Sequence, residues 1–185
     1  MSLAEWAALP EDEPGELVDG QLVEEEMPTY IHERIVAWLI LAVGTWGAQR
    51  GALVAGSGAK FAVAADRGRM PDVTIYLRGD RRPQPTGLID APPTIAIEIV
   101  SATPRDQRRD RIEKLEEYAR FGIRWYWLVD PELRSFEIFE RNADGRYVHL
   151  VGVSSGVIDP TPGCDGLALD VSALWAEVDE LIAGQ

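Results

Sequence analysis

The sequence is poor in cysteine and contains no long apolar run. It has one cysteine in 185 residues, Cys164, which excludes an internal disulfide and a cysteine-based metal cluster. The longest apolar stretch, residues 35–43, is shorter than the roughly 18 residues that are needed to span a bilayer. Residues 1–16 have neither the basic start nor the apolar centre of a secretory signal. We therefore expect a cytoplasmic protein without a membrane segment.

Basic residues are also scarce. The chain has 18 Lys and Arg against 31 Asp and Glu, a net charge of -13, which argues against a nucleic-acid function, because proteins that bind DNA through many phosphate contacts carry a basic surface. Ten acidic residues and no Lys or Arg lie in residues 1–33. The basic residues form two groups: Arg67, Arg69, Arg78, Arg81 and Arg82, and Arg105, Arg108, Arg109, Arg111 and Lys114. These groups predict either a local basic rim that holds a phosphate chain or ordinary solvated arginines.

Length and hydrophobic periodicity predict one α/β domain over residues 1–185. We expect helices at 28–51, 104–121 and 173–183, and strands at 52–55, 60–64, 73–77, 95–100, 124–129, 136–141 and 147–151. Gly56, Gly58, Asp66 and Gly68 are expected to form hairpin turns, and residues 78–93 a surface loop. This order predicts a central mixed β-sheet flanked by helices, with residues 1–15 peripheral and 170–185 forming a C-terminal cap.

Two carboxylate residues lie in predicted strands. Asp72 follows Pro71 at the start of one strand, and Glu98 interrupts the apolar run of residues 94–100. An unpaired buried carboxylate is costly, so Glu98 requires a cation or a proton, unless it lies at a sheet edge or pairs with an arginine. Two carboxylates at adjacent strand ends offer the oxygen ligands that Mg²⁺ prefers. The sequence therefore predicts a metal site at Asp72 and Glu98.

Lys114 is one of only two lysines, beside sixteen arginines. The pKa of a lysine can fall on burial, which makes it suited to roles that arginine cannot fill. Asp110, Lys114 and Tyr118 recur at a spacing of four and share one face of a helix. On that face Lys114 either reaches over the sheet to a water or phosphate, or forms a surface ion pair with Asp110.

The order of these residues resembles the PD-(D/E)XK nuclease superfamily. The usual lysine, two residues after the glutamate, is replaced here by Val100, but some branches carry it on the following helix, as Lys114 would be. More narrowly, the chain resembles the bacterial Uma-two family of restriction-endonuclease-like proteins from about residue 16 to about residue 169. The motifs are Glu16-Leu-Val-Asp-Gly20, His32, Pro71-Asp72, Ile97-Glu-Ile-Val-Ser101, Asp110-Arg-Ile-Glu-Lys114 with Tyr118, and Gly122-Ile-Arg-Trp-Tyr-Trp-Leu-Val-Asp-Pro131.

The resemblance implies a restriction-endonuclease-like core and a Mg²⁺- or Mn²⁺-dependent endonuclease that hydrolyses nucleic acid, with DNA as the expected substrate. It assigns Asp72, Glu98 and the backbone carbonyl of Ile99 to the metal, and Lys114 to catalysis. Glu16 would add an acidic group to the site, and the alternative is one more solvated acid. His32 would contact phosphate or a metal-bound water, and the alternative is a capping or packing role.

Other interpretations stay open. The net charge and Val100 favour a catalytically silent nuclease-fold module that binds or regulates, or a nuclease that needs a partner chain. A homodimer is expected because a single acidic domain would have to straddle two strands. The aromatic residues 125–127 indicate core packing or a dimer surface rather than base stacking. His149 and Cys164 have no partner motif.

Overall fold

The computed structural model describes residues 1–10, 13, 15–24, 27–101, 103 and 108–183. Its elements, in chain order, are α1 (Leu3–Ala7), β1 (Glu16–Val18), β2 (Gln21–Val23), α2 (Tyr30–Ala48), β3 (Leu53–Ala55), β4 (Phe61–Ala64), β5 (Arg67–Arg69), β6 (Val73–Tyr76), β7 (Ile95–Ile99), the π-helix η1 (Arg109–Glu113), α4 (Lys114–Phe121), β8 (Trp125–Asp130), β9 (Ser135–Arg141), β10 (Tyr147–Val153), β11 (Val157–Ile158), β12 (Leu169–Asp170) and α5 (Val171–Ala183). All seven predicted strands are present, as β3, β4 and β6 to β10. The predicted start of the second helix, residues 104–107, lies outside the described residues.

The central sheet has the strand order β10-β9-β8-β7-β6-β3. Strands β7 and β8 run parallel, with Ile97 opposite Trp127, whereas the other neighbouring pairs run antiparallel. The chain passes from β7 to β8 through η1 and α4, because parallel neighbours need a long crossover. The predicted mixed sheet flanked by helices is thus confirmed.

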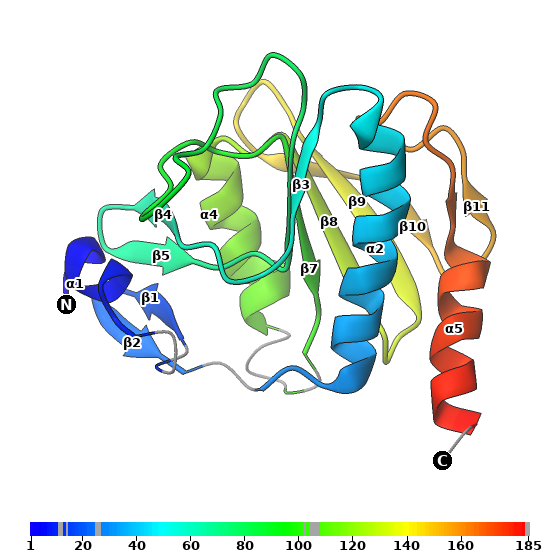
Figure 1. Cartoon of the computed structure of the whole chain (residues 1–185), viewed down its shortest axis with the longest axis horizontal. Helices are drawn as coiled ribbons and strands as arrows, with labels where there is room; N and C mark the ends of the chain where they lie inside the picture. Colours follow the sequence, from blue (N-terminus) through cyan, green and yellow to red (C-terminus); the bar gives the residue numbers. More distant parts are fainter. Residues whose placement is uncertain (11–12, 14, 25–26, 102, 104–107, 184–185) are drawn as a thin grey trace.

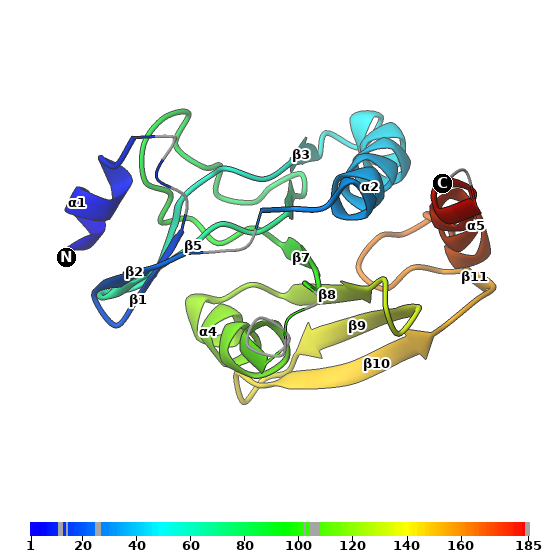
Figure 2. The same ribbon diagram turned by 90° about the horizontal axis from the view of Figure 1, so that it is seen from below.

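Helices cover both faces of this sheet (Figures 1 and 2). Helices α2 and α5 pack on one face and α4 on the other. Because side chains alternate along a strand, Ile95, Ile97 and Ile99 of β7 join the core under α2 and α5, whereas Ala96 joins the core under α4. Alternation therefore turns Glu98 toward α4.

The neighbouring strand β8 is buried along its whole length, and its aromatic residues 125–127 pack in the core, as predicted. Burial on both faces explains the nearly continuous apolar sequence of β7 and β8. In the part of the chain that the structure describes, no helix is both long and apolar enough to cross a membrane.

A smaller sheet with the order β2-β1-β5-β4 lies beside the central one. The hairpin predicted between β3 and β4 at Gly56 and Gly58 is wrong: β3 pairs with β6 in the central sheet and β4 with β5 in the small one. Turn residues allow the chain to change direction, but they do not determine with which strand each flanking strand pairs. Helix α1 packs here through Trp6, and a Cβ at Gly68 would lie 2.2 Å from the Trp6 ring.

Candidate active site

A cavity of about 170 Å³ lies at the carboxyl end of β7. Its lining includes His32, Asp72, Glu98, Ile99, Asp110 and Lys114. Four of the five residues predicted to be catalytic therefore share one cavity, although they come from α2, β7, α4 and the segment before β6. The fifth, Glu16, contacts Lys114 from β1.

Asp72 is held between a histidine and a backbone amide. His32 Nε2 lies 3.0 Å from Asp72 Oδ1, and the N–H of Ile99 donates to Asp72 Oδ2 at 2.7 Å. The side chain of Thr29 caps α2 by accepting from the N–H of His32, which places His32 in the first turn. Burial alone would lower the pKa of His32, but the hydrogen bond and charge of Asp72 raise it above its usual value. His32 thus orients a predicted metal ligand.

Glu98 is buried at 3% exposure in the middle of the central sheet. Its Oε1 accepts a hydrogen bond from the Tyr118 hydroxyl at 2.5 Å, and its Oε2 lies 3.0 Å from Lys114 Nζ. Burial raises the pKa of Glu98 well above its usual value; Lys114 opposes this shift, and Asp72 adds to it. The alternative of an edge position or an arginine partner is wrong, because β7 lies between β6 and β8 and the partner is a lysine.

Among the described residues, three carboxylates surround the buried Lys114. Its Nζ lies 3.0 Å from Glu98, 3.3 Å from Asp110 and 3.4 Å from Glu16. The ion pair with Asp110 forms as predicted by spacing, but it is buried rather than on the surface. A π-helical turn precedes the lysine, whose backbone N–H donates to the carbonyl of Arg109, five residues earlier. Such turns are often found at functional sites.

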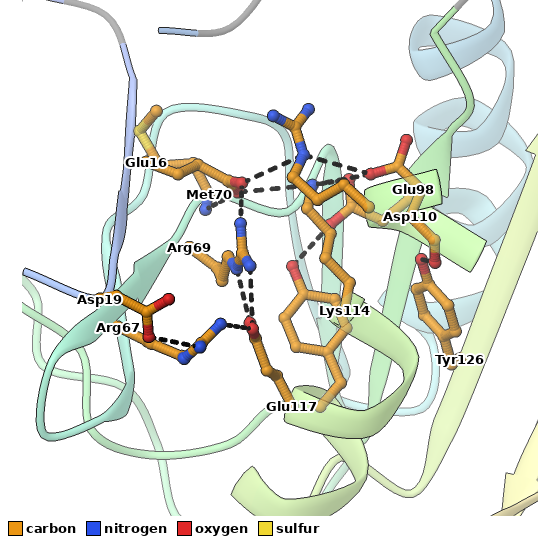
Figure 3. A network of polar contacts seen from close by, with 12 residues as sticks. Glu16, Asp19, Arg67, Arg69, Met70, Glu98, Asp110, Lys114, Glu117 and Tyr126 are labelled. Carbon is orange, nitrogen blue, oxygen red and sulfur yellow. Dashed lines mark hydrogen bonds and ion pairs between the residues drawn. The ribbon is translucent and has the colours of Figure 1, made fainter. Parts of the chain in front are cut away.

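Glu16 belongs to the buried network drawn in Figure 3. Its Oε2 lies 2.6 Å from Arg69 Nη1, and its Oε1 accepts from the backbone N–H of Met70 at 3.0 Å. Burial alone would raise the pKa of Glu16, but the positive charges of Lys114, Arg69 and Arg109 lower it to about 2. The alternative of a solvated acid is wrong, since Glu16 has no exposed surface.

Arg69 links this network to α4. Its guanidinium donates from Nε and Nη2 to the two carboxylate oxygens of Glu117, at 2.6 and 2.9 Å, and is fully buried. Paired N–H donors on one carboxylate give a strong and directional contact. The small sheet is therefore fixed to the helix that carries Lys114.

Among the described residues, the two predicted basic groups contribute only Arg109 and Lys114 to the lining of the cavity. Arg69 and Arg109 are buried at 0% and 6% exposure. Arg67 pairs with Asp19 and Glu117, and Arg111 pairs with Asp130 and Glu137. Arg105 lies outside the described residues. Several of the residues that were grouped by sequence proximity therefore neutralise acids within the fold.

Sequence reasoning named Asp110 and Tyr118 only as neighbours of Lys114 on a helix face. Their spacing of four was the signal that could have placed them in the site. Arg69 and Glu117 carried no such signal, because they lie 48 residues apart and meet only in the tertiary structure.

Two further polar residues are not part of the site. Cys164 is fully buried, and burial raises the pKa of its thiol to about 12, so it is a poor nucleophile. His149 packs against Phe139 and lies 3.5 Å from Glu137 on the outer hairpin.

The donor chemistry of the cavity fits a hard divalent cation. Asp72 and Glu98 present carboxylate oxygens, and each oxygen has a second lone pair beyond the hydrogen bond it already accepts. Within the described residues no group of three or more His, Cys, Asp or Glu is arranged to hold a metal. Two carboxylates are sufficient for Mg²⁺, which usually keeps several waters. The N–H of Ile99 donates to Asp72, and the role of the Ile99 carbonyl as a metal ligand stays a prediction.

The mixed sheet, with an acidic pair beside a buried lysine at one end, is characteristic of restriction-endonuclease-like domains. Residues 3–172 match the family model Uma2, described as "Putative restriction endonuclease", and the chain belongs to that family. The resemblance to this family is thereby confirmed.

One solved structure supports the fold. A protein from Anabaena variabilis ATCC 29413, described as "a putative nuclease belonging to DUF820", is 19% identical with a TM-score of 0.72, over 95% of this chain and 98% of that one. The restriction-endonuclease-like core is thus confirmed. The type IIG restriction endonuclease BpuSI is 16% identical over 89% of this chain and 18% of its own, with a TM-score of 0.42, too low to support any argument. Comparison with curated proteins found no match.

Proposed function

We propose that this protein is a divalent-metal-dependent endonuclease that hydrolyses phosphodiester bonds of nucleic acid, with DNA as the substrate. The observation that carries the proposal is the cavity in which Lys114 Nζ lies 3.0 Å from Glu98 and which Asp72 also lines. Membership of the Uma2 family supports the same activity class.

Each residue has a distinct role in this proposal. Asp72 and Glu98, with the carbonyl of Ile99, would hold Mg²⁺ or Mn²⁺. When bound, such an ion lowers the pKa of a water and offsets charge on the phosphate. Lys114 donates a hydrogen bond to the attacking water or to a phosphate oxygen, where negative charge develops. His32 orients Asp72 and is close enough to the cavity to contact the phosphate.

Glu16 acts through Lys114. Its carboxylate, 3.4 Å from Lys114 Nζ and fixed by Arg69, keeps the ammonium at the cavity. We therefore place Glu16 as a positioning residue rather than as one that touches substrate.

Cleavage assays with matched DNA and RNA substrates test the activity. With Mg²⁺ or Mn²⁺ we expect Asp72→Asn, Glu98→Gln and Lys114→Met each to slow cleavage by about 100-fold or more, the usual effect of removing a group that stabilises the transition state. Glu116→Gln is the matched control, because Glu116 is 63% exposed on α4 and pairs with the exposed Arg120. The proposal is wrong if all three variants cleave like the wild type, or if RNA alone is cut.

A catalytically silent binding module is the second candidate. It is favoured by the net charge of -13 and by the carboxylates of Glu16, Glu98 and Asp110, which already surround Lys114. Calorimetry with Mn²⁺ separates the two candidates. Binding that is lost in Asp72→Asn and Glu98→Gln supports the nuclease, whereas no binding to the wild type favours the module.

We also propose that a homodimer performs double-strand cleavage, since one cavity cuts one strand at a time. Sedimentation of the protein with and without duplex DNA measures its stoichiometry. A monomer that makes concerted double-strand cuts would contradict this assembly.

A further inference from the structure

A second hollow lies at the other end of the central sheet. It has a volume of about 580 Å³ and is lined by Trp46 and Arg50 at the end of α2, Arg78 after β6, and Arg124 and Trp125 at the start of β8. The catalytic cavity lies at the opposite end of α2, which begins at the lower edge of the molecule in Figure 1 and ends at the upper edge. The two sites are therefore separated by the length of the sheet.

Two of the three arginines stack on tryptophan rings. The guanidinium carbon of Arg50 lies 5.1 Å from the centre of the Trp46 ring, and that of Arg124 lies 5.4 Å from the centre of the Trp125 ring. Arg50 Nη1 also donates to the Trp46 carbonyl at 3.0 Å. Stacking holds a guanidinium plane while leaving N–H groups at its edge for a ligand. The hollow is thus pre-organised to donate hydrogen bonds.

The charge balance of the hollow is positive in a strongly acidic chain. Among the described residues, neither Arg50 nor Arg78 forms an ion pair, and Arg124 pairs only with Glu140, at 3.1 Å. Asp165 is the single acidic residue of the lining. These arginines differ from those near the catalytic cavity, which are largely neutralised within the fold.

The loop of residues 163–166 lies close to the two stacked Arg–Trp pairs. Gly163 has a φ of +79°, and a Cβ at this position would lie 2.5 Å from the indole nitrogen of Trp125. A Cβ at Gly166 would lie 3.0 Å from Arg50 Nη2. The indole nitrogen of Trp46 donates to the carbonyl of Asp165 at 2.9 Å, which fixes the loop against α2. The hollow is therefore a built feature rather than a chance gap between loops.

We propose that this hollow binds a phosphate-bearing ligand, with the phosphate on Arg50, Arg78 and Arg124. One carboxylate has roughly four lone-pair sites, which are too few for the N–H donors of three guanidinium groups. A phosphate has more oxygens than a carboxylate and carries more negative charge. The volume falls within the range of small-molecule sites, which leaves room for a nucleoside beside the phosphate. The ligand is a nucleotide unit, either free or at the end of a strand. The proposal does not depend on nuclease activity.

Binding is tested by calorimetry in EDTA, so that no metal holds phosphate in the catalytic cavity. The probes are pyrophosphate, adenosine monophosphate, and a single-stranded ten-nucleotide DNA with and without a 5′-phosphate. We expect the wild type to bind at least one of the phosphate-bearing probes. The double variant Arg50→Gln/Arg78→Gln should raise the Kd roughly tenfold or more, as expected for the loss of charge-assisted hydrogen bonds.

Arg120→Gln is the control, because it removes the same charge from a 73% exposed arginine on α4. Thermal unfolding checks that the double variant folds, and Arg78→Gln alone is the milder substitution. If none of the probes binds the wild type at millimolar concentration, or if the double variant binds like Arg120→Gln, the site does not exist. Tighter binding of the mononucleotide than of the 5′-phosphorylated strand identifies a free nucleotide. Tighter binding of the 5′-phosphorylated strand than of both the mononucleotide and the unphosphorylated strand identifies a strand end, and either result supports the site.

Discussion

At the scale of single residues, the cavity shows how a lysine and several carboxylates are buried together. Lys114 has 2% of its surface exposed and Glu98 has 3%. Removing such charges from water is costly, and the cost is offset only where the remaining hydrogen-bonding capacity is also satisfied. Tyr118 does this for Glu98, and Arg69 does it for Glu16. Substitution of Tyr118 or Arg69 therefore tests the site while the proposed metal ligands, Asp72 and Glu98, stay unchanged.

Tyr118→Phe is expected to weaken Mn²⁺ binding about 10- to 100-fold, because it removes the hydrogen bond that orients Glu98. Calorimetry measures the affinity. Tyr147→Phe is the control: its hydroxyl donates to the carbonyl of Ile123 at 2.9 Å, so it loses a hydrogen bond of similar kind away from the cavity. Equal Mn²⁺ affinity in the two variants would show that Tyr118 has only a structural role.

Glu16→Gln is expected to remove part of the acid sensitivity of the fold. The pKa of Glu16 is about 2 in the folded protein against an ordinary 4.5, so the folded state favours the ionised form. This contribution is present above pH 4.5 and is lost as the pH falls toward 2, and it amounts to about 3 kcal/mol.

Urea unfolding of wild type and Glu16→Gln between pH 3 and 7 measures this contribution. The comparison with Glu16→Gln separates the effect of Glu16 from that of Glu98 and Asp110, whose pKa values are raised mainly by burial and act in the opposite direction. The difference in unfolding free energy should shrink as the pH falls, and a difference independent of pH would contradict the prediction.

At the scale of elements, the small sheet and α4 are held together by charge, and α1 is held to the small sheet by packing. Arg69 at the end of β5 pairs with Glu16 at the start of β1 and with Glu117 on α4. The indole nitrogen of Trp6 donates to the carbonyl of Gly15, the residue before Glu16. Helix α1 therefore supports the strand that places Glu16 behind Lys114.

Trp6→Ala is expected to lower the free energy of unfolding by about 3–5 kcal/mol, since the ring is fully buried and its loss leaves a cavity over Gly68. Chemical denaturation measures the change. Leu41→Ala is the control, because Leu41 is 65% exposed on α2 and its truncation should cost little. A similar small cost for both variants would mean that α1 does not stabilise the domain.

At the scale of the whole molecule, the net charge of -13 limits how nucleic acid can bind. Among the described residues, the cations that line the cavity of Asp72 and Glu98 are Lys114 and Arg109, which are buried and lie close to carboxylates. Few phosphates can therefore be neutralised around the scissile bond, and the exposed arginines of the second hollow lie at the other end of the sheet.

We expect the affinity for duplex DNA to depend weakly on salt, with a slope of log K against log salt no steeper than about -3, because each neutralised phosphate contributes about -0.9. Fluorescence anisotropy of the Lys114→Met variant, which should not cleave, measures the slope. A slope of about -6 or steeper would reveal a broad phosphate-binding surface and contradict this expectation. Repeating the titration with Arg50→Gln/Arg78→Gln shows whether the second hollow contributes.

Local sequence alone was sufficient for the core elements and for the acidic pair. Short segments rich in β-branched, aromatic or other apolar residues predicted strands β6 to β10, and the conflict between Glu98 and its apolar strand marked it as a site residue, because burying a carboxylate needs a specific reason. The spacing of four between Asp110, Lys114 and Tyr118 likewise predicted that they share one face of a helix.

Only the tertiary structure decided which partners these residues have. The sequence could not show that β3 and β4 belong to different sheets, or that Arg69 is buried between Glu16 and Glu117, because pairing over such separations depends on packing rather than on neighbours in the chain. The same holds for the hollow of Arg50, Arg78 and Arg124, whose members come from three separate elements. The sequence indicated that the carboxylate of Glu98 is buried, because it interrupts an apolar strand, and the fold determined which groups neutralise it.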